Sequence, residues 1–301
     1  MQFKKLFFAT CMLFTLSTTA VTGHAAPSAA VDQDFPKQAD PHLQTLLDSV
    51  VDKRGISQLV KQKKISITLV DISQLKQPKM ANINGDTTLY AASLPKLAIM
   101  LAVFEEISQG NLEMTPSLRT SLDAMIKHSS NVEASRLYHL VGPARIAEIL
   151  QSERYQLYDQ DAGGGLWVGK EYGKEGAWKR DPLEHVSHGA SGLQVARFYY
   201  MLERSELASP ENCPVMKDIL ADSAINHKFV KGMNTIHPDA QVFRKSGTWR
   251  DYHADSAIIE RKDGRQYIAV VLAQTTQGGK LLEQIIVDLD NIIDQTPVAA
   301  G

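Results

Sequence analysis

Hydrophobic and polar positions along this chain predict a helix, then strands, then several helices, then strands, then a last helix. Apolar residues recur at helical spacing over residues 42–62, with a break expected at Gly55. Residues 65–71 alternate in the manner of a strand, and residues 80–83 and 87–90 are short candidate strands. The first part of the chain therefore predicts an amphipathic helix followed by a small sheet.

The middle of the chain is mostly helical by the same criterion. The helical spacing covers residues 117–126, 132–141, 143–152 and 191–202. Between about residues 154 and 187 lies a glycine-rich and charged segment with little periodicity. It is too long for an ordinary connection, and we expect a functional loop there.

The last third of the chain returns to strands. They are predicted at residues 241–246, 254–261 and 267–274, and an amphipathic helix follows at about 278–293. Because strands occur near both ends of the chain, the sheet must be assembled from both ends.

The first 26 residues have the features of a secretory signal peptide. Lys4 and Lys5 precede an apolar stretch that ends near Val21, and small residues around Ala26 offer a cleavage site. Threonines and serines interrupt the apolar stretch, so a membrane anchor is the weaker interpretation. We expect a periplasmic or secreted bacterial protein with a flexible lead over 27–40 and no stable membrane insertion after cleavage.

Composition narrows the picture further. Cleavage would leave about 275 residues, enough for one large domain or two interleaved subdomains. Cys213 would be the only remaining cysteine, which excludes an intrachain disulfide. The formal net charge of −2 gives no electrostatic reason to expect nucleic acid as a partner.

The sequence Ser93-Leu94-Pro95-Lys96 stands at the start of a long apolar helical run. On a helix, positions i and i+3 share one face, so the Lys96 amine could reach the Ser93 hydroxyl. An amine that is partly stripped of water has a lowered pKa and can accept that proton at neutral pH. Taken alone, however, the pattern is common at helix starts and would more often be structural.

Two further motifs accompany this one. They are Ser129-Ser130-Asn131, after an amphipathic helix, and Lys245-Ser246-Gly247-Thr248, at the end of a candidate strand. Alone, the first would be a helix N-cap and the second an ordinary strand end. Together the three motifs resemble, in order and spacing, the S-x-x-K, S-D-N and K-T-G set of class A β-lactamases and penicillin-binding proteins. The resemblance runs from about residue 41 to about residue 294.

This resemblance implies a fold and a domain organisation. The fold is an α/β sandwich in which helices flank a mainly antiparallel sheet, with an additional all-α subdomain and the active site between them. We expect the α/β part at 41–91 and 205–294, the α part at 92–204, and a tail at 295–301.

The resemblance also implies catalytic roles. Ser93 would attack a carbonyl and form an acyl-enzyme, and Lys96 would accept or relay its proton. Ser129 would pass a proton to the departing nitrogen, with Lys245 holding it in place. Backbone N–H groups of Ser93 and Thr248 would form the oxyanion hole.

Further residues would bind the substrate. Asn131 would offer its amide to a side-chain carbonyl, and Ser246 and Thr248 would bind a carboxylate with the lysine of their motif. Gly247 would leave room for the substrate along the strand edge. Arg250 lies two residues beyond Thr248, within reach of a substrate carboxylate, and the alternative role is a surface or structural ion pair.

The chain departs from the family pattern in its second motif, its third motif and its loop. Ser130 stands where the family has Asp, and Ser246 stands for Thr. Between Gln151 and Ser191 no E-x-x-L-N segment occurs, although that segment supplies the deacylating base in class A enzymes. The loop carboxylates, none in a matching context, are Asp159, Asp161, Glu171, Glu175, Asp181 and Glu184. Without a placed base, an acyl-enzyme would form and then hydrolyse slowly.

The same loop contains two patterns that we interpret as accidental. Residues 164–170 fit G-x-x-x-x-G-K, but Glu171 replaces the Ser or Thr that a phosphate loop requires. His185 and His188 lack further ligands at recognisable spacing. We therefore expect no cofactor and no metal. Trp167 is either a wall of the binding cleft or a packed loop aromatic.

The sequence thus predicts a secreted serine hydrolase that is acylated at Ser93 by β-lactams or related amides and hydrolyses them, with antibiotic resistance as the associated role. Two alternatives use the same nucleophile: a peptidoglycan-directed peptidase, amidase or esterase, and a binding protein that is acylated without turnover. The expected partner is a small β-lactam or cell-wall peptide, and we expect a monomer.

Overall fold

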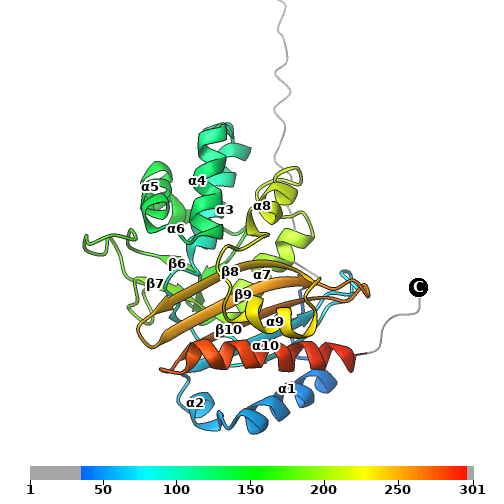
Figure 1. Ribbon diagram of the computed structural model, residues 1–301. Coiled ribbons are helices and arrows are strands. Elements are labelled where there is room, and N and C mark those ends of the chain that lie inside the picture. Colours follow the sequence, from blue (N-terminus) through cyan, green and yellow to red (C-terminus); the bar gives the residue numbers. More distant parts are fainter. Residues whose placement is uncertain (1–34, 297–301) are drawn as a thin grey trace, which may run out of the picture.

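The computed structural model describes residues 35–296 of the 301-residue chain. The predicted signal peptide at 1–26, part of the predicted lead and most of the predicted tail lie outside these residues. A five-stranded antiparallel sheet in the order β2-β1-β10-β9-β8 crosses the molecule (Figure 1). Its strands are β1 (Ile65–Asp71), β2 (Lys79–Ile83), β8 (Gln241–Trp249), β9 (Tyr252–Glu260) and β10 (Gln266–Gln274). The sheet is assembled from both ends of the chain, as predicted.

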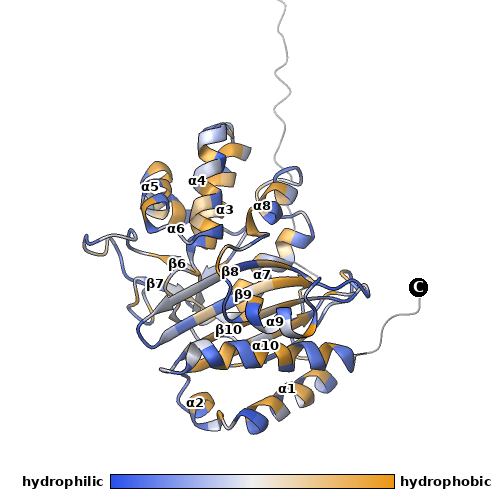
Figure 2. Cartoon of the chain, in the orientation of Figure 1, coloured by the Kyte–Doolittle hydropathy of each residue, from blue (hydrophilic) through white to orange (hydrophobic). Residues whose placement is uncertain are grey.

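Three helices pack on one face of the sheet (Figure 1). They are α1 (Pro41–Arg54), α9 (Phe229–Ile236) and α10 (Gly278–Asp294). Along α10, hydrophobic and hydrophilic stripes alternate (Figure 2), and Leu282, Ile286 and Leu289 are fully buried against the sheet. Gly55 ends α1 in the left-handed conformation, at φ 64°, and α2 (Ser57–Lys61) follows, which confirms the predicted break.

The opposite face of the sheet carries the larger core. Helix α7 (Gly192–Glu203) contacts β1, β9 and β10, and the other helices pack beyond it. Helix α3 (Lys96–Ser108) is central: its first ten residues are all buried. Around it lie α4 (Pro116–Lys127), α5 (Asn131–Val141), α6 (Pro143–Gln151) and α8 (Asn212–Leu220).

Short strands attach the long loop to the chain before Ser93. The sequence predicts that residues 87–90 join the main sheet, and this prediction is wrong. Strand β3 (Leu89–Tyr90) pairs instead with β7 (His188–Ala190), which also pairs with β6 (Trp167–Val168). Strands β4 (Tyr158–Asp159) and β5 (Gly164–Gly165) form a second small ladder in the loop. The loop is therefore held beside the segment that leads into Ser93.

Two boundaries differ from the predicted ones and bear on the site. Strand β8 continues to Trp249, so Lys245 to Thr248 lie within the strand and not at its end. Helix α3 begins at Lys96, so Ser93 lies in the preceding turn. Within residues 35–296, no helix combines the length and hydrophobicity needed to cross a membrane.

Candidate active site

The Ser93 turn lies directly against the edge strand β8. A side chain at Gly247 would place its Cβ 2.1 Å from the carbonyl oxygen of Ala91 and 2.8 Å from the nitrogen of Ser93. Only glycine permits this approach. The chain's own backbone therefore requires glycine at this position, and room for substrate along the strand edge stays a prediction. The contact fixes the third motif against the Ser93 turn.

The amine of Lys96 is buried and points toward the second motif. Its Nζ atom donates to the carbonyl oxygen of Ser129 at 2.6 Å and to Oδ1 of Asn131 at 2.8 Å. It also lies 3.4 Å from the hydroxyl of Ser129. Burial lowers the pKa of Lys96 to about 7. A substantial fraction of this amine is therefore neutral at physiological pH and can accept a proton.

Lys245 contacts the same hydroxyl as Lys96. Its Nζ donates to Oγ of Ser129 at 3.0 Å and to the carbonyl oxygen of Ser246 at 2.7 Å. Burial, followed by the nearby Lys96 charge, holds the pKa of Lys245 well below its usual range. The Ser129 hydroxyl thus lies between two amines, a position suited to moving a proton.

Ser129-Ser130-Asn131 serves as a helix cap and a site motif together. The Ser130 hydroxyl accepts from the Glu133 N–H at 3.2 Å and caps α5. Ser129 has a φ of 56°, the left-handed region, which a non-glycine residue adopts only when its surroundings hold it there. The cap turns Ser129 and Asn131 toward Lys96, while the serine that replaces the family's Asp does the capping.

The remaining predicted residues lie at the end of β8, in the turn after it and at the start of α5. Ser246 is buried, and Thr248 and Asn131 are exposed. Arg250 occupies the turn between β8 and β9 with a φ of 52°, and its guanidinium lies 5.7 Å from the centre of the Trp249 ring. The structure therefore brings the three motifs together and leaves Arg250 at the margin, stacked on its neighbour.

Sequence reasoning missed Lys228, whose amine is hydrogen-bonded to β8 and β9. Its buried Nζ donates to the Gly247 carbonyl at 2.7 Å, to Oγ1 of Thr248 at 2.8 Å and to the Ala254 carbonyl at 3.1 Å. Burial lowers the pKa of Lys228 to about 8. No local pattern marks this lysine, because its partners lie on β8 and β9.

A second buried support, also missed, joins β8 to β9. Arg244 and Asp255 form a two-pronged ion pair, with both N···O distances at 2.8 Å and both side chains almost completely buried. Asp255 also accepts from the Phe229 N–H at 3.1 Å. The pair fixes the backbone from which Lys245 projects.

None of the six loop carboxylates hydrogen-bonds to the site. Glu171 contacts His139 at 2.8 Å, and Asp181 is buried and accepts from the Glu184 N–H at 2.7 Å. The loop residue that reaches the site is Tyr172, whose ring centre lies 4.5 Å from Nζ of Lys96. No sequence pattern indicates this contact.

Trp167, the other loop aromatic singled out from the sequence, has a structural position. Trp167 is 1% exposed, and its indole N–H donates to the Lys179 carbonyl at 3.0 Å, so it is a packed loop residue.

A cavity of about 270 Å³ lies where β3, the β8–β9 turn and the loop meet. It is lined by Tyr90, Arg180, His185, Val186, Ser187, Trp249 and Tyr252.

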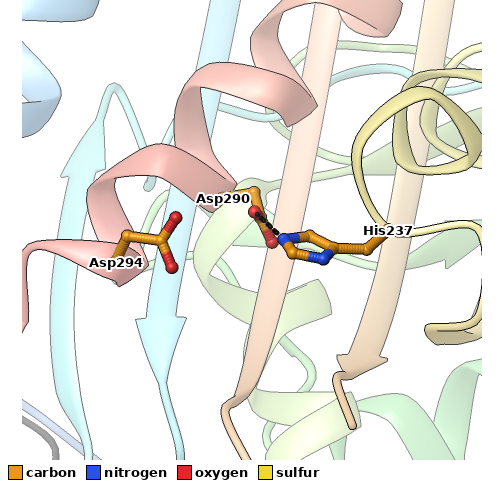
Figure 3. Close-up of side chains that lie close together, drawn as sticks. All are labelled: His237, Asp290 and Asp294. Carbon is orange, nitrogen blue, oxygen red and sulfur yellow. Dashed lines mark ion pairs between the residues drawn. The ribbon is translucent and has the colours of Figure 1, made fainter. Parts of the chain in front are cut away.

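A separate cluster of ionisable groups lies between α10 and the end of α9 (Figure 3). His237, Asp290 and Asp294 place one ligand atom each within 4.8 Å of one another. However, Nη1 of Arg261 already contacts Asp290 at 3.1 Å and Asp294 at 2.7 Å. The Tyr267 hydroxyl donates to Asp290 at 2.9 Å. A guanidinium therefore occupies the place of a cation, and we interpret the cluster as structural.

Comparisons with known proteins identify the family and the fold. The model of the beta-lactamase enzyme family matches residues 53–119 and 112–296, and the chain belongs to this family. No curated protein sequence matches significantly. Among solved structures, PBP-A superposes with a TM-score of 0.63 at 17% identity, covering 87% of this chain and 99% of PBP-A.

Two β-lactamase structures show the same likeness. The enzyme from Sphaerobacter thermophilus DSM 20745 has a TM-score of 0.63 at 15% identity, with 83% of this chain and 95% of that chain covered. The TLA-3 extended-spectrum β-lactamase has a TM-score of 0.62 at 12% identity, with 82% and 97% covered. The predicted β-lactamase-like fold is confirmed.

Proposed function

We propose that this protein is a serine hydrolase whose Ser93 is acylated by β-lactams or related amides. The observation that carries the proposal is the Ser129 hydroxyl between two buried amines, Lys96 and Lys245, beside the Ser93 turn. Perturbed amines gathered at one hydroxyl are a feature of sites that move protons. The family of the chain supports the same reaction class.

Acylation would proceed in three proton transfers. The Ser93 Oγ attacks the carbonyl carbon of the amide while neutral Lys96 takes the hydroxyl proton. The carbonyl oxygen becomes negatively charged, and the backbone N–H groups of Ser93 and Thr248 are the proposed donors to it. The C–N bond then breaks as the nitrogen receives the hydroxyl proton of Ser129. The ammonium of Lys96, which carries the proton taken from Ser93, returns a proton to Ser129.

Substrate would lie along the open edge of β8. Asn131 uses its Oδ1 to accept from Lys96, which leaves its NH₂ group for a substrate carbonyl. A substrate carboxylate would contact Ser246 and Thr248 and benefit from the buried charge of Lys228 behind Thr248. Arg250 would contribute at the margin of this carboxylate site.

The proposal includes the setting as well as the reaction. We propose a periplasmic or secreted monomer, because the first 26 residues have signal-peptide features and the expected substrates are extracellular. Antibiotic resistance would follow if β-lactams are hydrolysed rapidly.

A second candidate function follows from the loop. Within the described residues, no carboxylate forms an ion pair with Lys96, and the Tyr172 ring lies over it instead. This favours a protein that is acylated by β-lactams or cell-wall peptides and releases them slowly. A peptidase, amidase or esterase would use the same nucleophile.

One experiment separates these functions. The mature protein is incubated with a chromogenic cephalosporin and with penicillin G, and hydrolysis and intact mass are followed together. Rapid turnover identifies a β-lactamase, and a persistent adduct that is lost in Ser93→Ala identifies an acylated binding protein. If neither hydrolysis nor an adduct is observed, β-lactams are excluded as substrates. The search then turns to peptide amides and esters.

A further inference from the structure

The ring of Tyr172 is fixed over the amine of Lys96 by contacts at both ends of the residue. Its backbone N–H donates to Oγ of Ser135 on α5 at 3.0 Å. Its hydroxyl donates to the carbonyl oxygen of Ala92, next to the nucleophile, at 3.3 Å. Between these anchors, the ring centre lies 4.5 Å from Nζ of Lys96. The ring therefore bridges the helical part of the molecule and the Ser93 turn.

A second aromatic ring supports Tyr172. The ring of His188 lies 4.3 Å from it, centre to centre, and His188 is itself held through Nε2 at 3.1 Å from the Lys170 carbonyl. Burial lowers the pKa of His188 to about 4, so this ring is neutral at physiological pH. The two rings form an uncharged wall, with no loop carboxylate hydrogen-bonded to the amine.

The polar partners of Lys96 all come from the second motif. Ser129 and Asn131 supply its hydrogen bonds, and the Tyr172 ring covers it from the side of the loop. A ring face attracts an ammonium but cannot hold a water molecule as a hydroxyl or carboxylate can. Water on this side of Lys96 would have to displace the ring.

We propose that Tyr172 sets the lifetime of the acyl-enzyme by keeping water away from Lys96. The inference rests on the proposed acylation of Ser93. To free the serine, a water oxygen must attack the ester carbonyl carbon and give one proton to a base. The ester bond to Ser93 Oγ then breaks, and that oxygen takes a proton back. With the ring in place, Lys96 cannot hold this water, so acylation proceeds and hydrolysis of the ester is slow.

The test uses three substitutions that separate volume from chemistry. Tyr172→Phe removes only the hydroxyl, Tyr172→Leu keeps much of the apolar volume, and Tyr172→Ala opens the space. Each protein is acylated with penicillin G, freed of excess reagent, and followed by intact mass. Acylation rates are measured separately by rapid quench, and thermal unfolding checks that each variant is folded.

We expect the Phe and Leu variants to lose the adduct within about 3-fold of the wild-type rate, and the Ala variant to lose it at least about 10-fold faster. The acylation rate should stay within about 3-fold of the wild-type rate in all three variants. An Ala variant with the wild-type adduct lifetime, or a Leu variant as fast as Ala, would overturn the proposal. If Tyr172→Ala does not fold, Tyr172→Ser takes its place as the opened site.

The same data distinguish failure of this inference from failure of the proposed function. A wild-type protein that hydrolyses penicillin G rapidly is acylated, so the proposed function stands and the shielding role of Tyr172 is refuted. A wild-type protein that gives neither adduct nor product refutes acylation by β-lactams, and the inference falls with it.

Discussion

Around Asp290 the buried charges have partners of opposite sign, whereas within the described residues no carboxylate forms an ion pair with Lys96 or Lys245. Asp290 contacts Arg261, His237 and the Tyr267 hydroxyl, and is 1% exposed. Lys96 is completely buried and bonded only to neutral oxygens. Pairing stabilises a charged side chain in the interior, and lack of pairing keeps an amine neutral enough to accept protons. The first cluster is suited to stability and the second to chemistry.

Removal of the Lys96 amine tests this comparison with the largest expected effect. In Lys96→Met, the rate of Ser93 acylation by penicillin G should fall about 10²- to 10⁴-fold, because the base is lost. The free energy of unfolding should change little, since loss of a desolvated amine offsets loss of its hydrogen bonds. Rapid-quench mass spectrometry and urea unfolding measure the two effects. A large stability loss with acylation intact would assign Lys96 a structural role.

The converse substitution is Asp290→Ala. This change leaves Arg261 buried with fewer partners, so we expect the free energy of unfolding to fall by about 2–4 kcal/mol. The loss is limited because Asp294 still contacts the guanidinium. The folded variant should acylate at the wild-type rate. Unchanged stability in urea unfolding would argue that the cluster has another role, and metal binding would then be the first to examine.

The pH dependence of stability sharpens the contrast between the clusters. Burial lowers the pKa of Lys96 from 10.5 to about 7, so between these values the unfolded chain binds a proton that the folded chain does not. Stability contributed by this group therefore increases as pH rises through that window. Urea unfolding at about pH 7, 8 and 9 should show this slope, reduced in Lys96→Met. An identical slope in the variant would contradict the neutral amine.

The smallest effect is expected at the edge of the paired cluster. His237 is 32% exposed and contacts Asp290 at 3.1 Å, so His237→Gln should cost about 0–1 kcal/mol of unfolding free energy. Thermal unfolding of this variant beside Asp290→Ala gives the measurement. Equal losses in the two variants would show that the histidine, and not the guanidinium, neutralises Asp290.

The sequence predicted the main elements because their hydrophobic periodicity reflects burial on one face or on both. The strand at Ile65–Asp71 and the helix break at Gly55 have clear local signals. Helices α8 and α9 are short and were missed, and β3 was assigned to the main sheet although it pairs with β7. Such pairings depend on contacts between distant segments, which periodicity does not record.

The residues of the candidate site also fall into two groups, those that a sequence motif marks and those that only the fold identifies. Ser93, Lys96 and Lys245 stand in motifs and could be singled out from the sequence. Lys228 and Tyr172 act through partners far away in the chain, at Thr248 and Lys96, and no local pattern marks them. Gly247 was singled out, but the backbone that requires a glycine there is known only from the fold.

The most direct test of the unpaired amine is the pH dependence of acylation. The second-order rate constant for penicillin G is measured by rapid quench from about pH 5 to 9, and the adduct is located by peptide mapping. The rate should rise with pH around a midpoint of about 7, the pKa of Lys96, with the adduct on Ser93. An adduct on another residue, or a rate that does not change over this range, would contradict the account.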